Sequence, residues 1–373
     1  MPHRPNLFEE FPPVSKAEWL EKIKQDLKGK AIEALDWQVG SLKVSPFHHL
    51  DDRKDHSTAL SKNAGWLLGE DIPAHDLTAA NKLAHKALAA GAESLQFFID
   101  EPLGDHRLEG LLDGVNPAET DVRFYEANKN ASPAGLLHHL HHLVNKRKLA
   151  PASVRGAINW SEEATVVQDD LEELLRFAME HLPAFRVLPV NVKAKDDPAE
   201  ELRSMLEQLD HWLVTMTQAG FSAQAVLDHS QVLLTVNSNY FVSLCKFRAA
   251  RMLFHHLAEV WKAPAGKPFF DAAFVAYPQG DSPYNNLIQA TTQAISAIAG
   301  GADRLTVLPA DVQNPAKEEG SPTFRRMARN LHHILRSESY MEAVADPAAG
   351  SYFFEDLTEK LAAEAWRRFT EGK

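Results

Sequence analysis

Apolar positions along the chain alternate between short runs and longer segments of helical periodicity from about Asp51 onward. The short runs have the length of strands, and in each following segment the apolar residues recur every three or four positions. Strands that alternate with helices predict a parallel sheet covered by helices. The expected strands are residues 65–68, 94–99, 122–125, 155–158, 185–190, 232–236, 272–276 and 304–308.

Eight such units predict an α/β fold, a (β/α)8 or TIM barrel. The clearest unit lies in residues 281–308, where Asp281 and Ser282 can cap a helix, Gly300-Gly301 can end it, and an apolar strand follows. The apolar stripe of residues 202–216 is typical of a helix packed on a core. Two further helices, over residues 324–342 and 353–369, close the chain.

Residues 1–50 differ from the rest, so we divide the chain into an N-terminal arm and helix, 1–50, and a barrel, 51–373. Leu7, Phe8 and Phe11 lie in a segment too short to form its own core. Ser15 and Glu18 form a capping-box pattern for a helix that runs to about Gly29. The arm and helix either pack on their own barrel or wrap a partner subunit, and the pattern leaves both open.

The composition bounds the class of partner. A formal net charge of -12 argues against nucleic acid and against an anionic membrane surface. The N-terminal residues do not resemble a secretion signal, and no apolar stretch is long enough to span a bilayer. Cys245 is the only cysteine, which fits a reducing compartment. We expect a cytoplasmic protein.

In barrels of this type the chemistry takes place at the carboxyl ends of the strands, so polar residues there are the positional candidates for a site. No pair of acid and base stands out among them. A barrel hydrolase or lyase would use Glu126, Asn159 and Asn237. The strand-end candidates are Glu126, Asn159, Asn191, Asn237 and Gln279.

Other sequence signals of chemistry are weak. His138 and His142 share a helix face at a spacing that can chelate a divalent ion, but the metalloprotease Glu is missing and a solvated face explains them. We expect no native metal site. Gly-x-Ser-x-Gly, a Walker loop and a dinucleotide-binding glycine pattern are all absent, as is an Asp-x-His-x-x-Gly cobalamin-ligating motif.

Several motifs occur together in one order and spacing, and together they resemble matching runs of the methylmalonyl-CoA mutase family. The strong resemblance covers residues 239–366, and a weaker one extends back to about Trp37. The runs are residues 239–251, Asp281-Ser282-Pro283-Tyr284-Asn285-Asn286, Gly300-Gly301, residues 325–330, and Asp346 to Tyr352 with Gly350 and Ser351.

Members of that family rearrange acyl-CoA carbon skeletons by radical chemistry with adenosylcobalamin, and CoA threads the barrel axis. The resemblance implies three positions for catalysis and substrate contact, and this chain departs from all of them. Residues 189–192 lack the family's His, residues 275–280 lack its Gln-Thr-Ser-Gly run, and residues 45–49 lack its Tyr-Arg pattern. These departures resemble the small subunit of the heterodimeric mutase.

The resemblance therefore implies a small subunit with no catalytic residues of its own, which pairs with a large catalytic subunit. Acyl-CoA and adenosylcobalamin would then be bound by the assembled enzyme and not by this chain alone. The family positions Tyr284, Asn285, Asn286, Asp346, Gly350 and Ser351 would serve loop architecture more than chemistry. The alternative is a barrel that binds acyl-CoA and works with a separate cobalamin protein.

Two further expectations concern the axis and the extent of the chain. Phe97, Phe98, Phe124 and Phe274 predict an axis closed by bulky side chains, since alternation turns about half of such residues inward. The resemblance covers the barrel without a cobalamin-type domain, which was either removed or never encoded.

Overall fold

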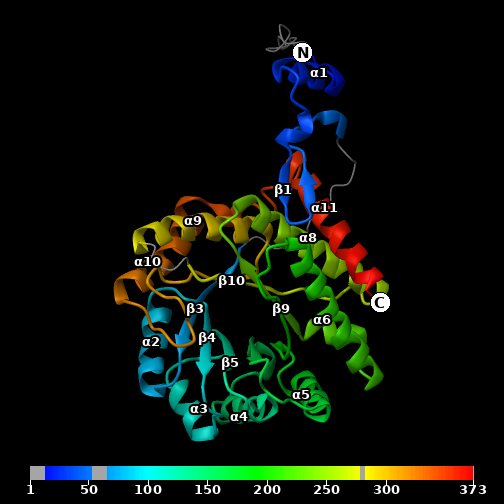
Figure 1. Cartoon of the computed structure of the whole chain (residues 1–373). Coiled ribbons are helices and arrows are strands. Elements are labelled where there is room, and N and C mark those ends of the chain that lie inside the picture. The colour runs from blue at the N-terminus through cyan, green and yellow to red at the C-terminus, as the bar shows by residue number, and fades with distance from the viewer. Residues whose placement is uncertain (1–12, 53–64, 278–281, 373) are drawn as a thin grey trace, which may run out of the picture.

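The computed structural model describes residues 13–52, 65–277 and 282–372. Its main sheet is a closed ring of parallel strands, seen below the N-terminal segment in Figure 1. This confirms the (β/α)8 barrel. In chain order the strands are β3 (Leu67–Pro73), β4 (Ser94–Ile99), β5 (Asp121–Glu126), β6 (Gly156–Trp160), β7 (Phe185–Arg186), β8 (Leu188–Asn191), β9 (Ser230–Val236), β10 (Phe270–Phe274) and β11 (Arg304–Thr306).

β7 and β8 are two halves of one barrel strand, divided at Val187. β7 pairs with β6 and β8 pairs with β9, while β11 pairs with β3, so the ring closes. The amides of Val187 and Leu188 both donate to the His229 carbonyl, which is the pattern of a β-bulge. The bulge leaves β8 bonded only to β9.

Helices surround the ring in the usual order of a barrel (Figure 1). Their apolar faces pack on the strands; the stripe expected in residues 202–216 is buried on α6, with only Trp212 left partly exposed. The helices are α2 (Leu77–Ala89), α3 (Asp105–Leu111), α4 (Pro133–Lys146), α5 (Gln168–His181), α6 (Pro198–Gln218), α7 (Ala223–Asp228), α8 (Tyr240–Val260), α9 (Pro283–Gly300), α10 (Pro322–His333) and α11 (Tyr352–Glu371).

α9 starts and stops as its sequence predicts. Ser282 accepts a hydrogen bond from the Tyr284 amide, and Gly301 ends the helix in the left-handed region at φ 99°. Gly300 has a different reason to be glycine: a Cβ there would lie 2.7 Å from the Leu244 carbonyl oxygen of α8. The glycine pair therefore lets α8 and α9 approach closely.

The N-terminal segment forms elements that the sequence pattern only partly predicted. α1 (Lys16–Asp26) has the expected capping box of Ser15 and Glu18. A two-stranded hairpin, β1 (Trp37–Val39) and β2 (Leu42–Val44), was not predicted, because three-residue strands carry too short an alternation to recognise. Trp37 stacks on Phe353 of α11, which seats the hairpin on the barrel body.

α1 lies beyond the hairpin and away from the barrel strands in Figure 1. It has no buried residue, and Trp19, Leu20, Ile23 and Leu27 remain half-exposed. Its contacts are local: Trp19 packs on Phe47, with ring centroids 5.6 Å apart. Leu7, Phe8 and Phe11 lie outside the described residues.

Candidate functional site

Charged side chains cross the axis in the amino-terminal half of the barrel. Arg304 of β11 donates from Nη1 to Asp271 of β10 at 2.9 Å and from Nε to Ser94 of β4 at 2.7 Å. Arg123 of β5 lies 3.3 Å from Asp271 and also donates to Gln231 of β9. All of these side chains are buried. They form a floor made of ion pairs and hydrogen bonds across five strands.

The floor replaces the expected aromatic plug. Arg123 faces the axis, so its neighbour Phe124 faces the helices, where it stacks on Phe97 at 6.0 Å. Alternation from Asp271 likewise turns Phe274 outward. Only Phe98 of the four phenylalanines faces the axis, and it is partly exposed. The prediction that bulky apolar residues close the axis is therefore wrong for Phe97, Phe124 and Phe274, and the charged floor crosses the axis instead.

Above the floor several inward side chains keep partial exposure, whereas Thr306, Asn159 and the side chains of the floor are buried. Asp71, Gln96, Phe98, Tyr125 and Thr235 all belong to this upper set. The rings of Phe98 and Tyr125 lie 5.5 Å apart on one wall. The inward side chains of this upper set are therefore partly accessible to solvent. We call this carboxyl-end part of the axis the cup, and it is the candidate functional site of the barrel.

β3 contributes one ionisable side chain, Asp71, to the cup. Gly69, two residues earlier, leaves the space that Arg304 and Thr306 need, since a Cβ there would lie within 2.8 Å of both side chains. Thr306 donates to Asp71 at 3.3 Å, and Arg304 Nη2 lies 3.6 Å from it. Burial raises the pKa of Asp71 to about 6, partly offset by the positive charge of Arg304.

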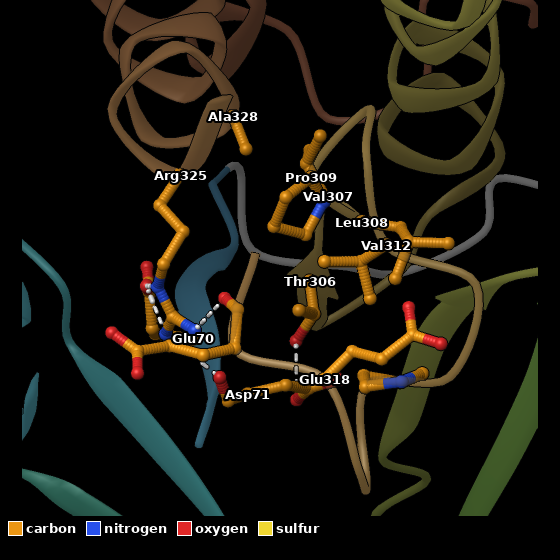
Figure 2. Close-up of a pocket in the computed structure, with 12 residues that line it drawn as sticks. Glu70, Asp71, Thr306, Val307, Leu308, Pro309, Val312, Glu318, Arg325 and Ala328 are labelled. Atoms are coloured by element: carbon orange, nitrogen blue, oxygen red, sulfur yellow. Dashed lines mark hydrogen bonds and ion pairs between the residues drawn. The ribbon is translucent and has the colours of Figure 1, made fainter. Parts of the chain in front are cut away.

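A narrow pocket lies beside Asp71, between β3 and the connection from β11 to α10 (Figure 2). Figure 2 shows Arg325 reaching from α10 to Glu70, to which its Nε donates at 2.9 Å. Arg329 donates to the same carboxylate oxygen at 2.8 Å. Two residues of the 325–330 motif thus anchor α10 to β3. Glu70 and Asp71 lie inside β3, and not beyond it as the expected strand 65–68 implied.

The strand-end candidates do not gather into one site. Asn159 and Asn191 pair through their side-chain amides at 2.7 and 2.9 Å. Glu126 lies one position beyond the inward-facing Tyr125 and accepts from the Ser132 amide at 3.2 Å. Asn237 accepts from Ser243 at the start of α8. Gln279 lies outside the described residues.

Glu126 is buried, and this burial raises its pKa to about 7. It is the one carboxyl group among the strand-end candidates, and with this pKa it can bind a proton near neutrality. Because alternation turns it toward the helices, it does not contribute an acid to the cup.

Asn191 occupies the strand where catalytic relatives were expected to carry a histidine. Its side chain is paired with Asn159, and its backbone N–H and C=O are both bonded by the Gln208 side chain of α6 at 2.9 and 3.0 Å. These contacts join β6, β8 and α6 where the bulge has removed the ladder between β6 and β8. Asn191 thus closes the barrel wall, which leaves no free group at this position.

The family-motif positions lie in two places. Tyr284 and Asn285 are exposed at the start of α9, with Tyr284 6.2 Å from Phe324. Asn286 is buried and donates to the Ala310 carbonyl at 2.9 Å. Gly350, at φ 81°, donates its amide to Glu355, and Ser351 is the first residue before α11.

Asp346 pairs with Arg248 of α8, while Arg251 of the same helix pairs with Asp303 after α9. Arg248 donates to Asp346 at 3.0 Å, to Glu355 at 3.0 Å and to Thr358 at 3.1 Å. Arg251 donates to the Gly301 carbonyl at 2.7 Å. The motif at 239–251 therefore contacts both the motif at 300–301 and the motif at 346–352, which links α8 to α9 and to α11.

Sequence reasoning missed the residues of the floor and the pair of Lys246 with Glu201. Lys246 of α8 and Glu201 of α6 are both buried and bonded to each other. The available signal was a charged residue inside an otherwise apolar strand or helix, as at Arg123 and Lys246. Such residues are almost never buried without a partner, but the sequence does not identify the partner.

Metal ligands and membrane-spanning helices are the two broader features to consider in the part of the chain that the structure describes. No group of three His, Cys, Asp or Glu residues is placed to hold a metal ion there. His139 and His142 instead contact Asp105 of α3 at 2.7 and 3.2 Å. None of the described helices has the length and apolarity needed to cross a membrane.

Comparison with known proteins supports the resemblance. The family model described as methylmalonyl-CoA mutase matches residues 151–372. The methylmalonyl-CoA mutase small subunit of Porphyromonas gingivalis is 29% identical, over 97% of this chain and 63% of that protein. The small subunit of Streptomyces virginiae is 30% identical, over 82% of this chain and 51% of that protein.

The probable methylmalonyl-CoA mutase small subunit of Mycobacterium bovis is 30% identical over 82% of this chain. This chain spans 52% of that relative and 63% of the Porphyromonas protein, so it corresponds to part of their length. The family match falls on the segment that holds β6 to β11 and the α8, α9 and α11 cluster. On this agreement of motif, fold and family model, the chain belongs to the methylmalonyl-CoA mutase family.

Proposed function

We propose that this chain is the barrel of the small subunit of a cytoplasmic, adenosylcobalamin-dependent methylmalonyl-CoA mutase. In this proposal it carries no active site of its own and supports a large catalytic subunit, which isomerises methylmalonyl-CoA and succinyl-CoA. The observation that carries the proposal is the set of hydrogen bonds that Asn191 makes with Asn159 and Gln208. A residue at a position expected to assist catalysis is instead committed to closing the wall with Asn159 and Gln208.

The charges around the axis support the same proposal. A carboxylate-bearing acyl group needs a cation or several donors to replace its hydration. Arg123 and Arg304 are bound to Asp271 in the floor, and Asp71 adds a carboxyl group above them. The upper set of Asp71, Gln96, Phe98, Tyr125 and Thr235 therefore offers no cation to such a substrate.

Adenosylcobalamin does not fit this chain alone. The sequence lacks the Asp-x-His-x-x-Gly motif, and the upper set together with Asn159 and Asn191 includes no histidine that could replace an axial ligand of the corrin. We assign the cofactor, which supplies the initiating radical when bound, to the assembled enzyme. No step of that chemistry is assigned to residues of this barrel.

We assign residues 1–50 to contact with the large subunit. The half-exposed apolar face of α1, made of Trp19, Leu20, Ile23 and Leu27, gains no cover from the described barrel residues. An amphipathic helix with such a face is stabilised when a partner buries it. Of the two alternatives for the arm, this face favours contact with a partner.

The test combines copurification with the large subunit and isothermal titration with methylmalonyl-CoA and succinyl-CoA. We expect a stable complex, no binding of either acyl-CoA by this chain alone, and binding by the complex. Trp19→Ala with Ile23→Ala should weaken the complex at least tenfold. The matched control is Lys24→Ala with Gln25→Ala, at exposed positions of α1, which should leave affinity unchanged.

Two outcomes would contradict the proposal. A chain that remains monomeric beside the large subunit at micromolar concentration would refute the supporting role. Binding of acyl-CoA by the isolated chain would instead favour the barrel that works with a separate cobalamin protein, since the cup would then accept the substrate.

A further inference from the structure

α5 is attached to the rest of the helical layer mainly through one neighbour. Among the described elements α4 is the only helix that makes an extensive contact with α5; α6 makes none of comparable extent. On the side away from α4, the Arg176 guanidinium lies 5.3 Å from the ring of Phe221, in the connection between α6 and α7. Leu174, Leu175 and Ala178 bury the inner face of α5 in the core, and within the helical layer its main contact is with α4 (Figure 1).

That contact is built from imidazole rings around one phenyl ring. His141 of α4 stacks on His181 of α5, with centroids 4.6 Å apart and planes 24° apart. Phe177 of α5 lies 4.4 Å from His181 and 4.1 Å from His138. Three titratable rings thus share a small contact that at neutral pH is formed by aromatic packing.

The charged groups around these rings are unevenly placed. On the α3 side, Asp105 contacts His139 and His142, and Glu109 pairs with Lys146, so both histidines there have a carboxylate beside them. On the α5 side, Glu173 lies 3.5 Å from His138 and Glu180 lies 3.8 Å from His181. Arg176 of α5 lies on the opposite side of the helix, against Phe221, and His106 of α3 is exposed.

His141 is the ring for which the structure shows no carboxylate partner among the described residues. Its Nε2 accepts a hydrogen bond from the Asn145 amide at 2.9 Å, a contact that requires an unprotonated nitrogen. Burial, then the neighbouring His181, His138 and His142, lower its pKa. A base with a lowered folded pKa destabilises the folded state as pH falls below the unfolded value.

We propose that α5 is an acid-labile helix, released from α4 when His141 and His181 both carry a proton. Two imidazolium rings at stacking distance repel each other, and protonated His141 also loses its bond from Asn145. Asp105 holds α4 to α3 under the same conditions. Across the α5 contact, of the three rings only His138 has a carboxylate on the facing helix, Glu173, so opening is expected on the α5 side. α5 then opens locally while the barrel remains folded.

The test is hydrogen exchange of the full chain, read by mass spectrometry at pH 7.5 and pH 5.5 with times scaled to the intrinsic exchange rate. We expect peptides of α5 to exchange roughly fivefold faster or more at pH 5.5, with α6 unchanged. His141→Phe keeps a stacking ring but cannot be protonated, so α5 should no longer respond. His106→Phe, at an exposed position of α3, is the matched control and should respond like the parent chain.

A second variant, His181→Phe, protects the test against a local packing defect at position 141 and should also abolish the response. Equal protection of α5 at both pH values in the parent chain would overturn the proposal. So would an unchanged acid response in both variants, or an acid response in which α6 loosens as much as α5, because unfolding would then be global.

Discussion

Removal of Lys246 tests whether the buried pair of Lys246 and Glu201 holds α6 to α8. The two side chains retain 0% and 1% exposure, so water cannot replace a lost partner. Glu201 also accepts from the Lys195 amide at 3.1 Å and from Thr235 at 3.4 Å, but these neutral donors do not balance its charge. Lys246→Met should therefore lower the free energy of unfolding by about 3–5 kcal/mol.

The double variant separates the lost pair from the lost packing. Lys246→Met with Glu201→Gln leaves no uncompensated charge, keeps a carbonyl acceptor for the Lys195 amide, and places an NH2 that can donate to the Thr235 hydroxyl. It should regain about 2 kcal/mol relative to the sum of the single variants. Lys22→Met is the control, because the pair of Lys22 and Asp26 is 67% and 66% exposed and should contribute under about 0.5 kcal/mol.

The assay is equilibrium unfolding in urea at pH 7, followed by far-ultraviolet circular dichroism and tryptophan fluorescence. The reasoning is refuted if Lys246→Met costs no more than Lys22→Met. It is also refuted if the double variant equals the sum of the singles, because the charges would then be energetically independent.

Three further predictions use the same unfolding assay. The pKa of Glu126 in the folded state is raised to about 7, so its contribution to the free energy of unfolding is present below about pH 4 and is lost as the pH rises to 7. Glu126→Gln should flatten this pH dependence and should stabilise the protein at pH 8 by about 2 kcal/mol relative to the parent chain. An unaltered pH profile would contradict this. Gly300→Ala should lower the free energy of unfolding by about 1–3 kcal/mol, because the added Cβ pushes α9 away from α8. Gly104→Ala is the control, since no atom lies within 4 Å of the added Cβ, and should change stability by under about 0.5 kcal/mol. Equal effects of the two variants would contradict the close approach of α8 and α9 as the reason for Gly300. Arg248→Lys should cost about 2–3 kcal/mol because an ammonium cannot bond Asp346 and its other partners together, and a neutral result would show that the cluster does not join the helices.

The order of strands and helices could be predicted from the sequence because it rests on local periodicity. Short apolar runs and helical stripes need no knowledge of partners, and the eight expected strands match the strands of the ring in order. Caps are local in the same way, as Ser15, Glu18 and Ser282 demonstrate. The family motifs could also be recognised in the sequence, whereas their contacts could not be predicted from it.

Which way a side chain faces, and which distant residue it pairs with, could be read only from the tertiary structure. Alternation states that Phe97 and Phe98 face opposite ways, but the position of Ser94 in the floor decides which one faces the axis. β3 extends through Glu70 because α10, some 250 residues later, supplies the arginines that neutralise it. Asn191 could be recognised as a departure from a catalytic pattern, whereas its use in closing the wall required Asn159 and Gln208 to meet it. The sequence by itself determined the elements and their order, because these depend on residues close in the chain; long-range contacts decided what lines the axis, because a buried charge is stable only where a distant partner meets it.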